Sequence, residues 1–160
     1  MTTDFDNPVP RPALSRLCQS LKAQGKRLIT TNGCFDILHV GHVRILQAAR
    51  ALGDALIVGI NSDESVRKLK GSGRPINGEL DRAEVLAALK CVDYVTIFGE
   101  DTPVEFLRAV KPDIHVKGSD YTADQLAETP VVEGFGGQVK ILDLVPGKST
   151  TAIVSRIQNN

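Results

Sequence analysis

The sequence predicts an α/β protein: a single Rossmann-like, doubly wound parallel sheet of five strands with helices on both faces. Short apolar runs alternate with amphipathic helical segments along the chain, which is the pattern of parallel α/β sheets. The run over residues 55–60 is apolar throughout, as is typical of a strand buried on both faces. The length of 160 residues suits one domain with its own core, so we expect a domain over residues 10–160 and a flexible arm over 1–9.

The first half of the chain is expected to form three helices and two strands. In order, these are a helix from Pro10 to Gly25, a strand over 27–31, a helix over 41–52, a strand over 55–60 and a helix over 62–69. The first helix is predicted by apolar residues at the spacing of one helix face: Leu14, Leu17, Cys18 and Leu21. Ser62 is placed to cap the third helix.

The second half continues the alternation after a Gly- and Pro-containing loop over residues 70–78. In order, we expect a helix over 79–89, a strand over 94–97, a helix over 103–110, strands over 114–116 and 138–142, and a closing helix over 149–157. Thr102 is the expected cap of the helix at 103–110. Pro130 breaks helical patterns, so the structure before the last strand stays open.

The composition argues against several classes of protein. Nineteen basic residues balance nineteen acidic ones, whereas proteins that bind nucleic acid usually present a basic surface. Aromatic residues make up 4% and Trp is absent, which argues against base stacking on single strands. Three cysteines without a CxxC pair predict neither a disulfide framework nor a zinc knuckle, and favour the reducing cytoplasm. The chain has no signal-peptide pattern and no apolar run of about 18 residues, so we expect neither export nor a membrane span.

Two histidines flank a glycine where the first strand is expected to lead into a helix: His39, Gly41 and His42. Glycine lets a ligand approach the backbone, and a helix N-terminus offers unpaired N–H groups and a positive dipole. Two imidazoles there can donate hydrogen bonds to phosphate, which would favour their charged form. A metal site and a plain structural role are the alternatives, but only one further histidine, His115, exists. We interpret the motif as a phosphate-handling site.

A second phosphate-handling element is expected near the C-terminus. Lys148 precedes three hydroxyl residues over 149–151, whose hydroxyls and free N–H groups at the start of a helix can hold phosphate. The segment imitates the end of a Walker A loop, but Leu142 stands where that loop needs glycine, so a P-loop is rejected. A plain helix cap is the alternative.

These segments resemble the HxGH nucleotidyltransferase superfamily, which includes the cytidylyltransferases. Similar elements cover residues 26–157: the signature at 33–42, then 61–65, 70–75, 81–82, 117–121 and 147–151. Their combination is most similar to the adenylyltransferase domain of bacterial ADP-heptose synthase. The Lys-Gly-x-Asp-Tyr element at 117–121 and the final Ser-Thr-Thr element point to this heptose branch.

The resemblance implies roles for particular residues. Catalytic roles are implied for His39, His42 and Lys70. Nucleotide and phosphate binding is implied for Asn32, Gly33, Cys34, Phe35, Gly41, Lys117, Gly118, Asp120, Lys148, Ser149, Thr150 and Thr151. Acceptor-substrate binding is implied for Asp36, Asn61, Arg74 and Arg82. Asp120 can accept from a sugar hydroxyl or from an exocyclic amine, and both stay open. A solvated loop is the alternative for Lys70 and Arg74, and an exposed helix position for Arg82.

The implied reaction converts ATP and a heptose 1-phosphate to ADP-heptose and pyrophosphate. ADP-heptose is then a precursor for the synthesis of lipopolysaccharide or another surface glycan. The attacking phosphate oxygen is already ionised, so no general base is required. Mg²⁺ on the triphosphate is the expected cofactor, without a metal site built from protein ligands. Expected partners are ATP and a small sugar phosphate, with a separate heptose kinase and phosphatase in the pathway. Nucleic acid and membrane are not expected partners, and homodimers are common in the superfamily.

Three other functions stay open at this point. Other enzymes of the superfamily use glycerol 3-phosphate or phosphocholine with CTP, or FMN with ATP. A non-catalytic nucleotide-binding module can retain the same motif. A tRNA-synthetase-like fragment would share an HxGH-type motif, but this sequence shows neither a second domain nor a basic surface for RNA.

Overall fold

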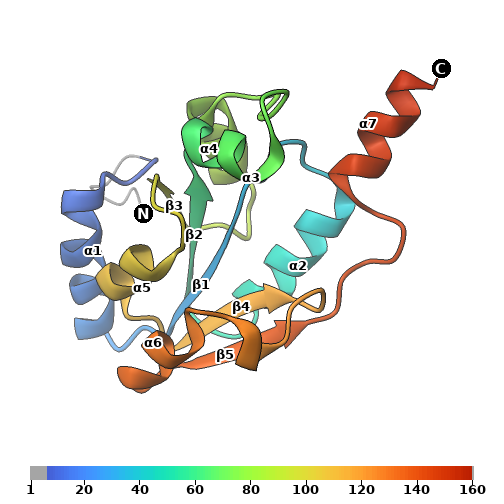
Figure 1. The fold of residues 1–160 in the computed structure, drawn as a ribbon. Coiled ribbons are helices and arrows are strands. Elements are labelled where there is room, and N and C mark those ends of the chain that lie inside the picture. The colour runs from blue at the N-terminus through green and yellow to red at the C-terminus, as the bar shows by residue number, and fades with distance from the viewer. Residues whose placement is uncertain (1–6, 160) are drawn as a thin grey trace.

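The computed structural model describes residues 7–159 and contains a five-stranded sheet whose neighbouring strands all pair in parallel (Figure 1). The strand order is β3-β2-β1-β4-β5. The strands are β1 Leu28–Gly33, β2 Ala55–Asn61, β3 Tyr94–Phe98, β4 Ile114–Gly118 and β5 Gln138–Leu142. The predicted doubly wound parallel sheet is therefore confirmed.

Helices cover both faces of the sheet. One layer contains α1 Arg11–Ala23, α5 Val104–Val110 and α6 Thr129–Gly134, and the other contains α2 Val40–Arg50 and α4 Glu79–Ala87 (Figure 1). The remaining elements are α3 Asp63–Lys70, the 3₁₀ turn η1 Ala123–Gln125 and α7 Thr150–Gln158. Helix α7 has no buried residue and extends away from the sheet (Figure 1). Within residues 7–159, no helix is long and apolar enough to cross a membrane.

The side chains of β2 alternate between two hydrophobic cores, because successive residues of a strand point to opposite faces. Ile57 packs in the same cluster as Phe106 of α5, whereas Val58 packs in the cluster that contains Leu46 of α2. All seven residues of β2 are buried. Burial on both faces explains why the run over 55–60 is apolar throughout.

The sheet changes its direction of winding between β1 and β4. Strand β1 pairs with β2 on one side and with β4 on the other. In open α/β sheets, ligands bind beyond the carboxyl ends of the strands at this kind of switch point. Strand β1 ends at Gly33 and β4 at Gly118, so the elements at 33–42 and 117–121 meet at the same edge.

Residues 7–9 are held in place, which corrects the prediction that this part of the chain is a flexible arm. Val9 is buried, and its N–H donates to the Val95 carbonyl at 2.7 Å. The Thr96 hydroxyl donates to the Val9 carbonyl at 2.8 Å, and the Val95 N–H donates to the Asn7 side chain at 2.9 Å. The polar composition gave no sign of this, since backbone pairing depends little on side chains. Residues 1–6 of the predicted arm lie outside the described residues.

The helix starts were partly predictable. Ser62 caps α3 through its side chain, as expected. Ser149 caps α7 through its side chain, which was the alternative considered for this residue, and its contact with phosphate stays a prediction. Thr102 was the wrong cap for α5, because the residue before this helix is Pro103 and no side chain caps it. Pro130 lies in the first turn of α6, which begins at Thr129, and does not break a helix, since a proline in the first turn lacks only an N–H that has no helical partner.

Candidate active site

The two motif histidines lie side by side at the start of α2. His39 is the N-cap residue, and its Nδ1 accepts a hydrogen bond from the Gly41 N–H at 3.1 Å. Nδ1 of His42 accepts from the His39 N–H at 3.3 Å, and the two ring centroids are 3.9 Å apart. Because each Nδ1 accepts a hydrogen bond, each neutral ring carries its own proton on Nε2. The start of α2 therefore presents two Nε2–H donors next to its free backbone N–H groups.

Both rings are neutral in the protein as it stands. Burial, together with the charge that His39 can carry, lowers the pKa of His42 to about 4. Burial and the neighbouring charge of Lys148 also lower the pKa of His39. At neutral pH the pair therefore offers neutral donors to an anion. The charged form expected with a bound phosphate stays a prediction.

The depressed pKa of His42 makes stability depend on pH. The unfolded chain takes up a proton on this residue near pH 6.5, whereas the folded chain does so only near pH 4. The free energy of unfolding should therefore fall as pH drops from 6.5 to 4, by on the order of 2 kcal/mol. Urea unfolding of the wild type and of His42→Gln across this range measures the difference. Equal pH slopes in the two proteins would contradict the depressed pKa.

The start of α7 packs against the start of α2. A Cβ atom on Gly41 would lie 2.8 Å from Cε1 of His39 and 3.3 Å from Cβ of Lys148, so a larger residue would displace the His39 ring and press on Lys148. The Thr150 hydroxyl donates to the Ile37 carbonyl at 3.2 Å, which ties α7 to the loop before α2. Two helix N-termini, two imidazoles and an exposed lysine thus converge, as an anion site requires.

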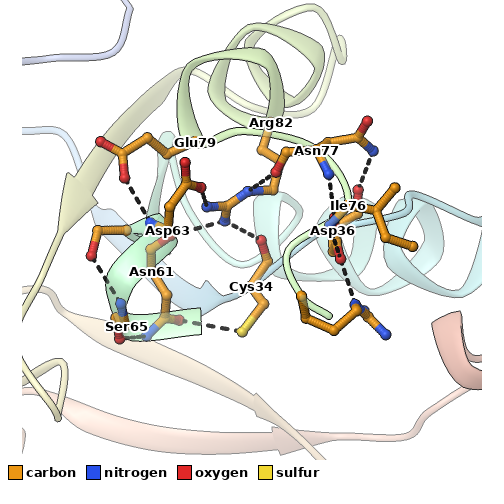
Figure 2. A network of polar contacts seen from close by, with 11 residues as sticks. Cys34, Asp36, Asn61, Asp63, Ser65, Ile76, Asn77, Glu79 and Arg82 are labelled. Carbon is orange, nitrogen blue, oxygen red and sulfur yellow. Dashed lines mark hydrogen bonds and ion pairs between the residues drawn. The ribbon is translucent and has the colours of Figure 1, made fainter. Parts of the chain in front are cut away.

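Arg82 of α4 lies beneath the loop that follows β1 (Figure 2). Its guanidinium donates to four groups at 2.7–3.0 Å: the carbonyls of Cys34, Asn61 and Asn77, and the carboxylate of Asp63. Its exposed fraction is 2%, which excludes the exposed helix position considered from the sequence. Arg82 joins the ends of β1 and β2 to α3 and α4, and thereby holds the frame of the site. Its contact with substrate stays a prediction.

Asp36 anchors the loop that carries Arg74 (Figure 2). Its carboxylate accepts from Nε of Arg74 at 2.6 Å and from the N–H groups of Ile76 and Asn77 at 2.9 Å. Burial raises the pKa of Asp36, but these hydrogen bonds outweigh burial and lower the pKa below its ordinary value. Asp36 and Arg74 therefore form an ionised pair over the end of β1, and their contact with an acceptor substrate stays a prediction.

Cys34 packs beneath the same loop. Its Sγ lies 3.9 Å from Oδ1 of Asn61, whose amide donates to the Ser65 hydroxyl at 2.9 Å. Burial raises the pKa of the Cys34 thiol, against the lowering effect of the nearby Lys70 charge, so the thiol is protonated at neutral pH. This arrangement suits a packing residue and not a nucleophile. Lys70 itself ends α3 and is exposed, without a hydrogen-bond partner within residues 7–159.

Lys117 lies at the switch point, at the end of β4. Its Nζ is 3.2 Å from Oδ1 of Asn32 on β1 and 3.3 Å from the carboxylate of Glu128. It also lies 4.8 Å from the ring centroid of Tyr121. A Cβ atom on Gly118 would lie 2.6 Å from the end of the Leu144 side chain, so the loop after β5 passes close to this glycine.

The structure brings most of the predicted residues to one edge of the sheet. Three segments surround the end of β1: the motif at 33–42, the loop at 70–77 and the start of α7. Asn32 of β1 and Lys117 of β4 lie next to each other at the same edge. Asp120 and Thr151 are exposed. Phe35 has a φ of 48°, which shapes the turn before α2. The sequence analysis did not identify Glu128 as a partner of Lys117, because the two are separated by a segment whose structure the sequence left open.

Within residues 7–159, no group of three or more His, Cys, Asp or Glu side chains is arranged to hold a metal ion. A divalent ion can instead be carried by the phosphates of a nucleotide.

The chain matches the cytidylyltransferase-like family over residues 30–156. It is 53% identical over 156 residues to the Bifunctional protein HldE of Pelobacter propionicus, covering 97% of this chain and 32% of that protein. It is 53% identical over 146 residues to the Bifunctional protein HldE of Geotalea uraniireducens, covering 91% of this chain and 30% of that one. The chain thus spans about a third of the length of these relatives.

Two solved structures are similar in fold. The lipopolysaccharide core biosynthesis protein from Thermoplasma volcanium GSS1 superposes with a TM-score of 0.63 at 32% identity, covering 76% of this chain and 98% of that one. The pantoate-beta-alanine ligase from Francisella tularensis also has a TM-score of 0.63, at 15% identity, covering 94% of this chain and 77% of that one. The second likeness concerns the fold alone.

Proposed function

Because this chain belongs to the cytidylyltransferase-like family, we propose that it is a nucleotidyltransferase that transfers AMP from ATP to a heptose 1-phosphate. The products are ADP-heptose and pyrophosphate, and the pathway leads to lipopolysaccharide or another surface glycan. The name of the Thermoplasma structure supports the pathway. The elements at 117–121 and 147–151 support the heptose substrate, through the family resemblance.

The paired Nε2–H donors of His39 and His42, set between the starts of α2 and α7, carry this proposal. Charge must build on the pyrophosphate that leaves the α-phosphorus, and donors placed in advance stabilise such charge. The nucleophile, a sugar phosphate oxygen, is already ionised. The site accordingly needs convergent donors and cations more than a general base.

The magnitudes require several groups to act together. A helix dipole contributes roughly 0.3–1 kcal/mol at an exposed site. Enzymes typically lower the activation free energy by about 8 kcal/mol or more. One well-placed donor to developing charge supplies roughly 2.7–4 kcal/mol of this. Two imidazoles, Lys70, Lys148 and the N–H groups of α7 together reach the required range, with positioning of the two substrates in addition. We include Mg²⁺ in the proposal as the ion on the triphosphate, where it neutralises phosphate charge.

The proposal extends to the cellular setting. We place the enzyme in the cytoplasm, where ATP is available, and assign the supply of heptose 1-phosphate to kinase and phosphatase activities. The relatives are named bifunctional, and this chain corresponds to about a third of each. A homodimer is part of the proposal through the family resemblance.

Pyrophosphate release tests the proposal directly. The purified protein is incubated with Mg²⁺ and either ATP or CTP, against a panel of sugar 1-phosphates, glycerol 3-phosphate, phosphocholine and FMN. We expect pyrophosphate release with ATP and a heptose 1-phosphate, and separate assays of the two anomers show which of them the enzyme uses. Release with CTP and glycerol 3-phosphate would replace the proposed substrates, and nucleotide binding without any release would indicate a non-catalytic module.

Lys70→Ala should lower kcat by roughly 10- to 100-fold, because it removes an exposed cation from the phosphate site. The free energy of unfolding should change by no more than about 0.5 kcal/mol, as for other surface substitutions. Lys68→Ala is the matched control on the same helix, since Lys68 pairs with exposed Glu64 at 3.2 Å. A change in thermal stability alone for Lys70→Ala, with normal turnover, would contradict this assignment.

A further inference from the structure

A buried charged cluster lies beside the switch point, between β4 and the start of α6. Glu128, the residue before α6, places Oε1 3.3 Å from Nζ of Lys117 and 3.9 Å from Nε2 of His115. The exposed fractions are 9% for Lys117, 5% for Glu128 and 0% for His115. His115 and Lys117 are two residues apart on β4, so both side chains point to the face that α6 covers.

The cluster connects directly to the end of β1. Nζ of Lys117 donates to Oδ1 of Asn32 at 3.2 Å, and Nδ1 of His115 lies 2.8 Å from the Thr30 hydroxyl on the same strand. An ammonium group has three donors. Glu128 and Asn32 take two of them. The third has no hydrogen-bond acceptor among the described residues, and with the Tyr121 ring centroid 4.8 Å from Nζ, a ligand at the switch point can take this N–H.

The charges in the cluster are settled by its surroundings. Burial raises the pKa of Glu128, but the adjacent His115 ring and the Lys117 charge outweigh burial and lower the pKa to about 2. Burial lowers the pKa of His115, so its ring is neutral at neutral pH. Nε2 of His115 is buried and has no hydrogen-bond partner within the described part of the chain. Glu128 is therefore an ionised carboxylate that pairs with the Lys117 ammonium.

The stability of the fold does not explain why Lys117 and Glu128 form a buried ion pair. Taking two charges out of water costs about as much as their attraction returns, and apolar residues of similar volume often serve stability equally well. A buried pair does, however, fix the position of a flexible lysine. Lys117 has four rotatable side-chain bonds, and Glu128 and Asn32 restrict its ammonium to one place at the ligand-binding edge.

We propose that Glu128 is a positioning residue, which holds the Lys117 ammonium against Asn32 so that its free N–H contacts the bound nucleotide. The inference rests on the proposed function, since it assumes a nucleotide at the switch point. Glu128 acts only through Lys117 and does not touch the nucleotide. Its loss should consequently weaken nucleotide binding without slowing the chemical step.

A double-mutant cycle on nucleotide affinity tests this inference. Binding of MgATP and of MgCTP is measured by titration calorimetry for the wild type, Glu128→Gln, Lys117→Met and the double variant, each first shown to be folded by circular dichroism. We expect Glu128→Gln to weaken binding about tenfold when Lys117 is present and less than twofold in the Lys117→Met background, since coupled residues are not additive. KM for the nucleotide should rise by a similar factor, with kcat within about twofold.

Controls separate positioning from a general effect on structure. Glu133→Gln changes an exposed carboxylate of α6 and should leave affinity unchanged. Glu128→Asp keeps the charge but withdraws it by one methylene group, and it carries the same cycle if the Gln variant does not fold. An equal loss of affinity in both backgrounds, or no loss at all, would overturn the inference.

The outcome is distinguishable from failure of the proposed function. Wild-type protein that binds nucleotide but releases no pyrophosphate would refute the proposed function, and the cycle would still report on Glu128. Folded wild-type protein that binds neither MgATP nor MgCTP would overturn both.

Discussion

His42→Ala is expected to lower kcat by roughly 10²–10³-fold while the protein stays folded, as for the loss of one donor to developing charge. The side chain provides one of the two Nε2–H donors at the start of α2, and a methyl group provides none. Its removal also leaves the His39 N–H without its acceptor, at a cost of about 1 kcal/mol. Pyrophosphate release at saturating substrates measures the first effect, and urea unfolding measures the second.

Two further substitutions at this position separate catalysis from helix capping. The amide nitrogen of His42→Gln can take the place of Nε2 and keeps a donor, whereas the amide oxygen of His42→Asn can take the place of Nδ1 and keeps the acceptor for the His39 N–H. We expect turnover to be higher in the Gln variant and stability to be higher in the Asn variant. A fully active and folded His42→Ala protein would refute the mechanism.

Arg82→Met is expected to lower the free energy of unfolding by about 3–5 kcal/mol, as for other buried charge networks that lose one partner. The substitution leaves the Asp63 carboxylate and three carbonyl oxygens without the guanidinium that they share (Figure 2). For a chain of this size, such a change lowers Tm by on the order of 10 °C. Thermal and urea unfolding measure it.

Two comparisons show whether the geometry of Arg82 or only its charge is required. Arg82→Lys keeps the charge, but a single ammonium cannot reach four acceptors in the plane of a guanidinium, so most of the loss should remain. Arg67→Met removes an exposed arginine from the neighbouring helix α3 and should change stability by no more than about 0.5 kcal/mol. Similar values for Arg67→Met and Arg82→Met would show that the buried network contributes nothing particular.

The elements of the fold were predictable because their signals are local. The apolar spacing of Leu14, Leu17, Cys18 and Leu21 places them on the buried face of α1. The continuous apolar run of β2 reflects the two cores on either side of it. Errors arose where local signals are weak: the backbone pairing of Val9 with β3 and the formation of α6 around Pro130 depend on the rest of the fold.

Within the site, the groups next to each other in sequence were found and the groups joined through space were not. His39, Gly41 and His42 interact within one helical turn, so their arrangement follows from their spacing. The proximity of this motif to α7 is a property of the tertiary structure, because Ile37 and Thr150 are 113 residues apart in sequence and all of the strands β2 to β5 lie between them in the chain.

The sequence by itself determined the class of fold, the paired-histidine motif and the family, since each rests on residue type and short-range spacing. Only the tertiary structure decided that Arg82 is a buried hydrogen-bond donor to several loops, that Asp36 anchors the loop with Arg74, and that Glu128 forms an ion pair with Lys117. The physical reason is that charged side chains look alike in a sequence whether solvated or buried. Their roles depend on which strand ends and loops the sheet brings within hydrogen-bond distance, and on how much water the surrounding fold excludes.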